Sequence, residues 1–121
     1  MFAAGAEYSY NLARMRYEIV LAPGAVRSLR KLPAHIRALV RDALERHLRF
    51  EPAKVSKSGI RRVRGLSRPQ YRLRVAEVRV FYDVTETTVE VLAIVSKAEA
   101  QAWLDAEGTP PTGGGFGAGQ G

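Results

Sequence analysis

The segment YRLRVAEVRVFYDV, residues 71–84, predicts a β-hairpin around which the rest of the chain can be placed. Apolar residues recur at every second position, which is typical of strands with one buried face. A two-residue turn at Ala76 and Glu77 would pair Val75 with Val78 and so fix the register of the whole hairpin. One face is then wholly apolar. The other face carries Arg72, Arg74, Arg79 and Phe81.

The sequence on either side of the hairpin predicts a small α+β domain. Period-two apolar residues predict a strand at 16–22, and VEVLAIV at 89–95 is typical of a central strand covered on both faces. Apolar residues at helical spacing predict a long amphipathic helix at 33–50. A further strand is expected at 60–66, and shorter helices at 25–31 and 97–105. The order β-α-α-β-β-β-β-α predicts a mainly antiparallel sheet with helices packed on one face.

Both ends of the chain differ in composition from the predicted domain at 15–106. Residues 1–14 lack periodicity and are expected to form a flexible extension ahead of Met15, a candidate natural start. Residues 107–121 are rich in Gly and Pro, so we expect a disordered tail. The first residues do not resemble a signal peptide, and no apolar run is long enough for a membrane span. We therefore expect a soluble, cytoplasmic protein.

The composition excludes several kinds of site. The 121 residues include no cysteine, which excludes a disulfide scaffold, a thiol nucleophile and a thiolate metal site. The two histidines, His35 and His47, are too few for a multi-histidine metal centre, and we expect neither a metal nor a cofactor. His35 is expected to be exposed in the first turn of the long helix. His47 falls on its apolar stripe, where core packing is expected.

Charge is unevenly distributed along the chain. Of the 19 cationic residues, 15 are arginines, and the formal net charge is +7. Residues 52–79 carry nine cations and one acid, whereas residues 80–121 carry one cation and six acids. A concentrated basic block indicates a polyanionic partner, either nucleic acid or an acidic protein segment. The alternative interpretation is a well-solvated, arginine-rich surface.

The arginine face of the hairpin is the candidate site. Like charges directly opposite each other destabilise a strand pair, so three clustered arginines suggest a bound anion. Phe81 beside them is placed to stack a nucleic-acid base. The alternative is that the arginines point into solvent and are screened by salt.

Three segments together resemble the RelE/ParE superfamily of bacterial toxins. They are RVRGLSRPQYRLRV at 62–75, VRVFYDV at 78–84 and VEVLAIVSKAEAQAW at 89–103, and the resemblance covers about 16–104. It implies a RelE-like fold and the toxin of a type II toxin–antitoxin system. RelE-like members cleave mRNA on the ribosome without a metal, by attack of the 2′-hydroxyl to leave a 2′,3′-cyclic phosphate.

The resemblance also implies roles for individual residues. Arg72 and Arg74 match the two cations of the sheet, Arg79 matches the arginine of the next strand, and Lys97 matches a basic residue after the last strand. These four are the candidate catalytic residues of an endoribonuclease. The candidate RNA-binding residues are Arg61, Arg62, Arg64, Arg68 and Phe81.

The sequence departs from the RelE-like pattern in its last segment. Ala98 and Leu104 stand where RelE-like nucleases often carry an arginine and a tyrosine or histidine. Arginine is a poor general base. The candidates for proton transfer are Lys97, Glu77, Glu99 and Tyr82. The departure leaves two alternatives open: a ParE-like inhibitor of DNA gyrase, and a non-catalytic basic module that binds nucleic acid.

The same resemblance implies partners. The expected partners are a cognate acidic antitoxin, the ribosome and mRNA, with no membrane, and operator DNA is expected to bind through the toxin–antitoxin complex. Trp103 and Leu104 are candidate antitoxin-binding residues. The alternative for both is ordinary packing of an amphipathic helix.

Overall fold

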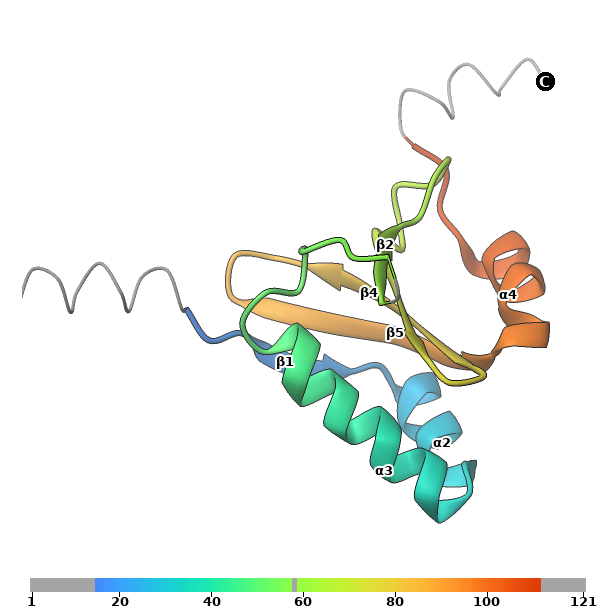
Figure 1. The fold of residues 1–121 in the computed structure, drawn as a ribbon. Coiled ribbons are helices and arrows are strands. Elements are labelled where there is room, and N and C mark those ends of the chain that lie inside the picture. Colours follow the sequence, from blue (N-terminus) through green and yellow to red (C-terminus); the bar gives the residue numbers. More distant parts are fainter. Residues whose placement is uncertain (1–14, 58, 112–121) are drawn as a thin grey trace, which may run out of the picture.

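A five-stranded sheet forms the centre of the computed structural model, which describes residues 15–57 and 59–111 (Figure 1). Its strands lie in the order β1-β5-β4-β3-β2. The bounds are β1 Glu18–Leu21, β2 Ile60–Arg62, β3 Tyr71–Val75, β4 Val78–Val84 and β5 Thr88–Ser96. Strand β1 pairs with β5 in parallel, and the other three pairings are antiparallel, so the predicted mainly antiparallel α+β fold is confirmed. The expected extension at 1–14 lies outside the described residues.

The register predicted for the central hairpin is correct. Val75 pairs with Val78, Leu73 with Val80 and Arg74 with Arg79. Ala76 adopts a positive φ of 52°, which allows the Ala-Glu dipeptide to close a tight turn without a glycine. The apolar face of the hairpin is buried throughout: Tyr71, Leu73, Val75, Val78, Val80 and Tyr82.

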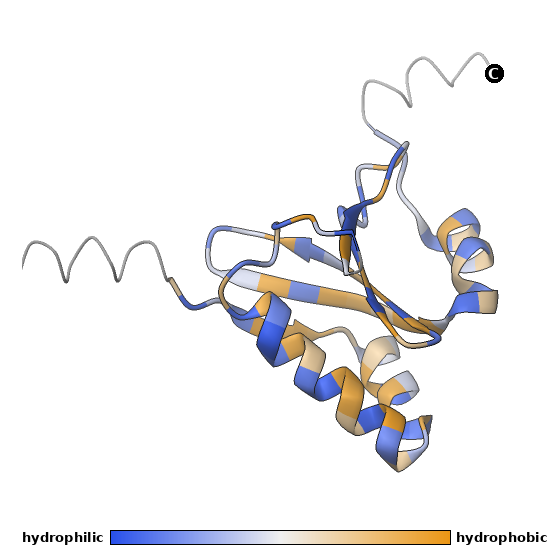
Figure 2. Ribbon diagram, in the orientation of Figure 1, coloured by the Kyte–Doolittle hydropathy of each residue, from blue (hydrophilic) through white to orange (hydrophobic). Residues whose placement is uncertain are grey.

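Two helices cover this apolar face. Helix α2 (Pro23–Lys31) and helix α3 (Ala34–Ala43) contribute Ala25, Leu29 and Val40 to the core. Hydrophobic and hydrophilic residues alternate along both helices, as expected of amphipathic helices (Figure 2). In the part of the chain that the structure describes, no helix is long and apolar enough to cross a membrane.

The long helix predicted at 33–50 ends in a wider turn. Residues Leu44–Leu48 form a π-helical turn, and Leu44 and Leu48 both remain buried. Because hydrogen bonds in a π turn span five residues rather than four, positions four apart stay on one face. His47 is rotated away and is exposed, so its predicted place in the core is wrong. His35 is exposed as predicted.

The last helix differs from the others in its position. Helix α4 (Ala100–Glu107) follows a short 3-10 turn at Lys97–Glu99, labelled η2. Trp103 stacks on Phe81 with ring centroids 5.1 Å apart and an angle of 6° between the rings. Phe81 belongs to the arginine face of the hairpin. Helix α4 therefore packs on the face opposite α2 and α3, whereas all helices were expected on one face.

The first residues of the predicted tail pair with the segment between β2 and β3. Thr109 forms an antiparallel bridge with Arg68, and its N–H donates to the Arg68 carbonyl at 2.8 Å. The prediction of disorder from residue 107 is therefore wrong up to Pro111, and residues 112–121 lie outside the described residues. Strand β2 is also shorter than predicted, because Gly65, with a φ of 79°, bends the chain away from the sheet.

Candidate anion-binding site

A cleft of about 1360 Å³ opens between the segment that follows β2 and helix α4. Seven of its lining residues are cationic and only one, Asp105, is acidic. The cations are Lys57, Arg61, Arg62, Arg64, Arg72, Arg79 and Lys97. Apolar side chains, among them Leu66 and Leu104, complete the walls. Such a lining favours an anionic ligand that also presents apolar surface, as a nucleotide does.

Arg72 is one of the residues that line this cleft. On β3 it is paired with Arg61 of β2 and with Phe81 of β4. Its side chain is half-buried, and its Nε is buried without a hydrogen-bond partner. Burial lowers the pKa of the Arg72 guanidinium, and the charges of Arg79, Arg61 and Arg74 lower it further. A bound phosphate oxygen would give the Nε an acceptor and offset this repulsion.

Arg79 lies in the same cleft but is fixed to its own hairpin. It is only 6% exposed, and its Nη1 donates to the carbonyls of Ala76 at 2.9 Å and Val78 at 3.0 Å. It therefore supplies a fixed positive charge rather than a mobile side chain. Strand alternation placed Arg79 on this face as a candidate catalytic residue, but it does not show that the hairpin carbonyls lie within reach of the side chain.

Arg74 shares the face of Arg72 and Arg79 but does not line the cleft. It is exposed and is paired with Arg79 across the hairpin. The structure thus brings together Arg72, Arg79 and Lys97 of the four predicted catalytic residues. Arg74 acts on the cleft only through the electrostatic repulsion of Arg72.

Phe81 is not available to stack a base. It is only 1% exposed because the indole of Trp103 covers its ring. The predicted RNA contact of Phe81 is therefore wrong in this structure, and the cause is a helix more than twenty residues further along the chain. Trp103 itself is half-buried in this stack, and Leu104 lines the cleft.

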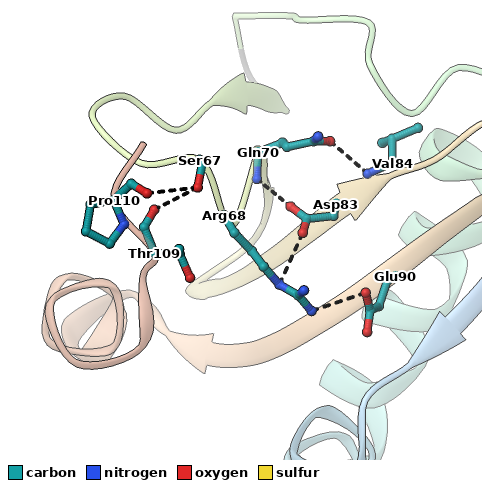
Figure 3. A network of polar contacts seen from close by, with 8 residues as sticks. All are labelled: Ser67, Arg68, Gln70, Asp83, Val84, Glu90, Thr109 and Pro110. Carbon is teal, nitrogen blue, oxygen red and sulfur yellow. Dashed lines mark hydrogen bonds and ion pairs between the residues drawn. The ribbon is translucent and has the colours of Figure 1, made fainter. Parts of the chain in front are cut away.

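The predicted RNA-binding arginines are divided between two places. Arg61, Arg62 and Arg64 line the cleft, but Arg62 also lies over the Tyr71 ring, 5.3 Å from its centroid. Arg68 points elsewhere: its Nε lies 3.3 Å from Asp83 Oδ2, and its Nη2 donates to Glu90 Oε1 at 3.2 Å (Figure 3). Arg68 is therefore engaged in a structural network rather than in the cleft.

Asp83 is the most enclosed carboxylate of that network. Its Oδ1 accepts a hydrogen bond from the Gln70 backbone N–H at 2.7 Å (Figure 3). Burial raises the pKa of the Asp83 carboxyl, although the Gln70 hydrogen bond and the Arg68 charge act in the opposite direction. The folded protein then holds this proton more tightly than the unfolded chain does. The resulting stabilisation is present below the unfolded pKa and is lost as pH rises through the folded pKa.

Asp83→Asn is expected to remove this part of the pH dependence of stability. The amide keeps an oxygen that can accept from Gln70, but it does not titrate. The free energy of unfolding should be measured by urea titration between about pH 3 and pH 7, a range that spans the ordinary aspartate pKa. Asp42→Asn, at a side chain that is 65% exposed, is the matched control. A variant at Asp83 that kept the original pH slope would contradict the assignment.

The four residues predicted as candidates for proton transfer differ in whether they line the cleft. Tyr82 is fully buried on the helix-covered face, donates to the Pro52 carbonyl at 2.6 Å and has a raised pKa because of burial. Glu77 and Glu99 do not line the cleft, whereas Lys97 does. Asp105, which the sequence analysis did not select, is the carboxylate on the lining. Its spacing of four residues from Gln101 and three from Gly108 was the signal that could have identified it.

Among the described residues, no group of three or more His, Cys, Asp or Glu side chains is placed to hold a metal ion.

Comparison with known proteins gives a consistent result. The family model described as "ParE toxin of type II toxin-antitoxin system, parDE" matches residues 19–101. The chain is similar to a protein in the toxin–antitoxin complex RelBE2 from Mycobacterium tuberculosis, with 27% identity, 69% of this chain and 94% of that chain covered, and a TM-score of 0.56. It is also similar to one in the archaeal RelE–RelB complex from Pyrococcus horikoshii OT3, with 25% identity, coverage of 69% and 97%, and a TM-score of 0.53. No curated protein matched the sequence.

Proposed function

The chain belongs to the ParE toxin family of type II toxin–antitoxin systems, and we propose that it acts as a toxin by cutting mRNA on the ribosome. The observation that carries this proposal is the Arg72 guanidinium, whose buried Nε has no partner in a cleft lined by seven cations. The likeness to the two RelE–RelB complexes at 25% identity or more supports the choice of RNA.

The proposed reaction requires stabilisation of negative charge on phosphorus. The RNA 2′-oxygen attacks the adjacent phosphorus, the bond to the 5′-oxygen breaks, and the phosphorane between these states carries additional charge. Arg72 and Arg61, paired across β2 and β3, are placed to bind its oxygens, and Arg79 adds fixed charge. On the cleft lining, Asp105 is the available acceptor for the 2′-hydroxyl proton and Lys97 the available donor for the 5′-oxygen.

The ribosome would supply what the cleft lacks. Asp105 is exposed, and its Oδ1 accepts from Gln101 Nε2 at 2.9 Å, so the cleft alone does not enclose a strong base. Positioning of the mRNA by the ribosome can contribute a large part of the rate enhancement. The basic lining would bind ribosomal RNA phosphates, and this binding should weaken steeply with added salt.

A second candidate function is inhibition of DNA gyrase. The match of residues 19–101 to a family model described as a ParE toxin favours it. The departures at Ala98 and Leu104 from the RelE-like pattern are compatible with it. In that case the cleft would be a binding surface rather than a catalytic site.

The proposed partners follow from the same comparisons. RelE–RelB complexes join a toxin to an antitoxin, and an antitoxin partner is supported for this chain. We propose an acidic segment that neutralises the cationic cleft and contacts Trp103 and Leu104 on α4. Binding of operator DNA by the toxin–antitoxin complex and a cytoplasmic location complete the proposal.

The deciding experiment adds purified protein to programmed ribosomes and, separately, to naked mRNA. We expect primer extension to detect cuts only in the sample with ribosomes, because the cleft lacks an enclosed base. A parallel assay measures supercoiling of plasmid DNA by gyrase. Intact mRNA in both samples, together with inhibited supercoiling, would replace the proposed function with the second candidate.

A further inference from the structure

Helix α4 is attached to the sheet by few contacts. None of its residues is fully buried. Ahead of it, at the first residue of the 3-10 turn, the Lys97 N–H donates to the Glu77 carbonyl at 2.7 Å. In its middle, Trp103 stacks on Phe81. The attachment of the C-terminal end of α4 therefore depends on the residues that follow the helix.

Those residues, Gly108–Pro110, form a strap across the end of the cleft. The Thr109 N–H donates to the Arg68 carbonyl at 2.8 Å, and the Ser67 N–H donates to the Thr109 carbonyl at 2.8 Å. The Ser67 hydroxyl lies 3.1 Å from the carbonyl oxygens of both Thr109 and Pro110 (Figure 3). The strap thus joins the end of α4 to the segment between β2 and β3.

Gly108 permits the close approach that the strap requires. A Cβ at this position would lie 2.5 Å from Leu66 Cδ1 and 2.6 Å from the Leu104 carbonyl oxygen. Leu66 and Leu104 belong to opposite walls of the cleft, and Gly108 and Pro110 line its end. The strap therefore lies close to both walls, at Leu66 and at Leu104.

We propose that the strap is a latch that holds α4 on the sheet and limits access of a polyanion to the cleft. The choice of a polyanion as ligand rests on the proposed function, whereas the attachment of α4 by the strap is inferred independently of it. The strap lies beyond residues 19–101, which match the family model. The two contacts of the Ser67 hydroxyl are exposed to solvent, as expected of a contact that opens and closes.

Trp103 provides the measurement, because it is the single tryptophan of the chain. Release of α4 would expose its indole, which now covers Phe81. Quenching of its fluorescence by iodide is measured in the full chain and in Gly108→Ala, where the added Cβ must displace the strap. The quenching constant is expected to rise at least about twofold if α4 becomes locally detached. Gly24→Ala is the matched control, since a Cβ there meets only Arg27 Nη2 at 3.7 Å.

Two truncated chains distinguish the effect of the strap from the effect of the residues that follow it. A chain that ends at Glu107 lacks the strap and should behave like Gly108→Ala. A chain that ends at Pro111 keeps the strap and should behave like the full chain. Ser67→Ala removes two contacts without adding a clash, and should give an intermediate result. Far-UV circular dichroism verifies that each variant is folded.

Access to the cleft is measured with an oligoribonucleotide in which every 2′-hydroxyl is methylated, so that it binds without being cut. Gly108→Ala should bind it about tenfold more tightly if the latched state is the major one. Unchanged iodide quenching in both Gly108→Ala and the chain ending at Glu107 would overturn the latch. The latch would also be overturned if the original protein binds the oligonucleotide and the variants show increased quenching but the same affinity. Increased quenching in a protein that binds no oligonucleotide in any form would show that the strap holds α4 but would overturn its role in access to the cleft, and the ribosome assay decides the RNA function separately.

Discussion

Arg72→Ala is expected to lower the rate of mRNA cleavage on ribosomes by about 10²–10³-fold, the usual effect of removing one group that stabilises transition-state charge. The side chain lines the cleft, and its buried Nε lacks a hydrogen-bond partner. The pKa of its guanidinium is lowered by burial and by three neighbouring arginines, so the charged form is destabilised in the folded protein. A bound phosphate would offset this destabilisation. The loss should appear in kcat, as well as in binding, because the charge on phosphorus grows in the transition state.

Arg74→Ala is the matched control for this prediction. It removes the same side chain from the same strand and the same face, but from a position outside the cleft. Its effect on cleavage should remain below about tenfold, as expected of an exposed charge screened by salt. Equal losses in the two variants would show that general charge, rather than the Arg72 site, determines activity.

Stability provides a second readout for the same pair. An arginine with an unsatisfied, buried Nε and three cationic neighbours does not stabilise the fold in the absence of a ligand. The urea midpoint of Arg72→Ala should therefore equal or exceed that of the original protein. A strongly lowered midpoint would mean that lost cleavage reflects unfolding, and would contradict a role limited to the ligand.

Local sequence pattern was sufficient for the central hairpin. The alternation in 71–84, together with a two-residue turn, predicted every pair between β3 and β4. It succeeded because one apolar face admits only registers that keep that face intact. The clustering of Arg72 and Arg79 on one face follows from the same register of β3 and β4. This is why part of the candidate site could be predicted from the sequence.

Long-range contacts account for the errors. Nothing near Phe81 in the sequence indicates that Trp103 covers it, and nothing near Arg68 indicates that Asp83 and Glu90 bind it. The strap was missed because Gly- and Pro-rich composition indicates disorder, whereas Gly108 is in fact required for close packing. His47 was misplaced by a single π turn, which a fixed helical period cannot anticipate.

Leu73→Ala is expected to lower the free energy of unfolding by about 2–5 kcal/mol, the usual range for a leucine truncated in a core. Leu73 is fully buried, and its neighbours on β3, Arg72 and Arg74, face the opposite side of the sheet. The loss is a large share of the roughly 5–15 kcal/mol that stabilises most domains, so the variant is best measured at low temperature or in a stabilising buffer.

Leu39→Ala is the control that distinguishes burial from residue type. Leu39 is on α3 and is 48% exposed, so its truncation should change stability by no more than about 0.5 kcal/mol. Urea unfolding monitored by circular dichroism measures both variants. Leu73 anchors the strand that presents Arg72. Leu73→Ala should therefore reduce mRNA cleavage only under conditions in which the protein unfolds. Arg72→Ala, in contrast, should reduce cleavage while the protein remains folded. A Leu73→Ala protein that lost no more stability than Leu39→Ala would show that the alternation along β3, and with it the placement of Arg72 in the cleft, is wrong.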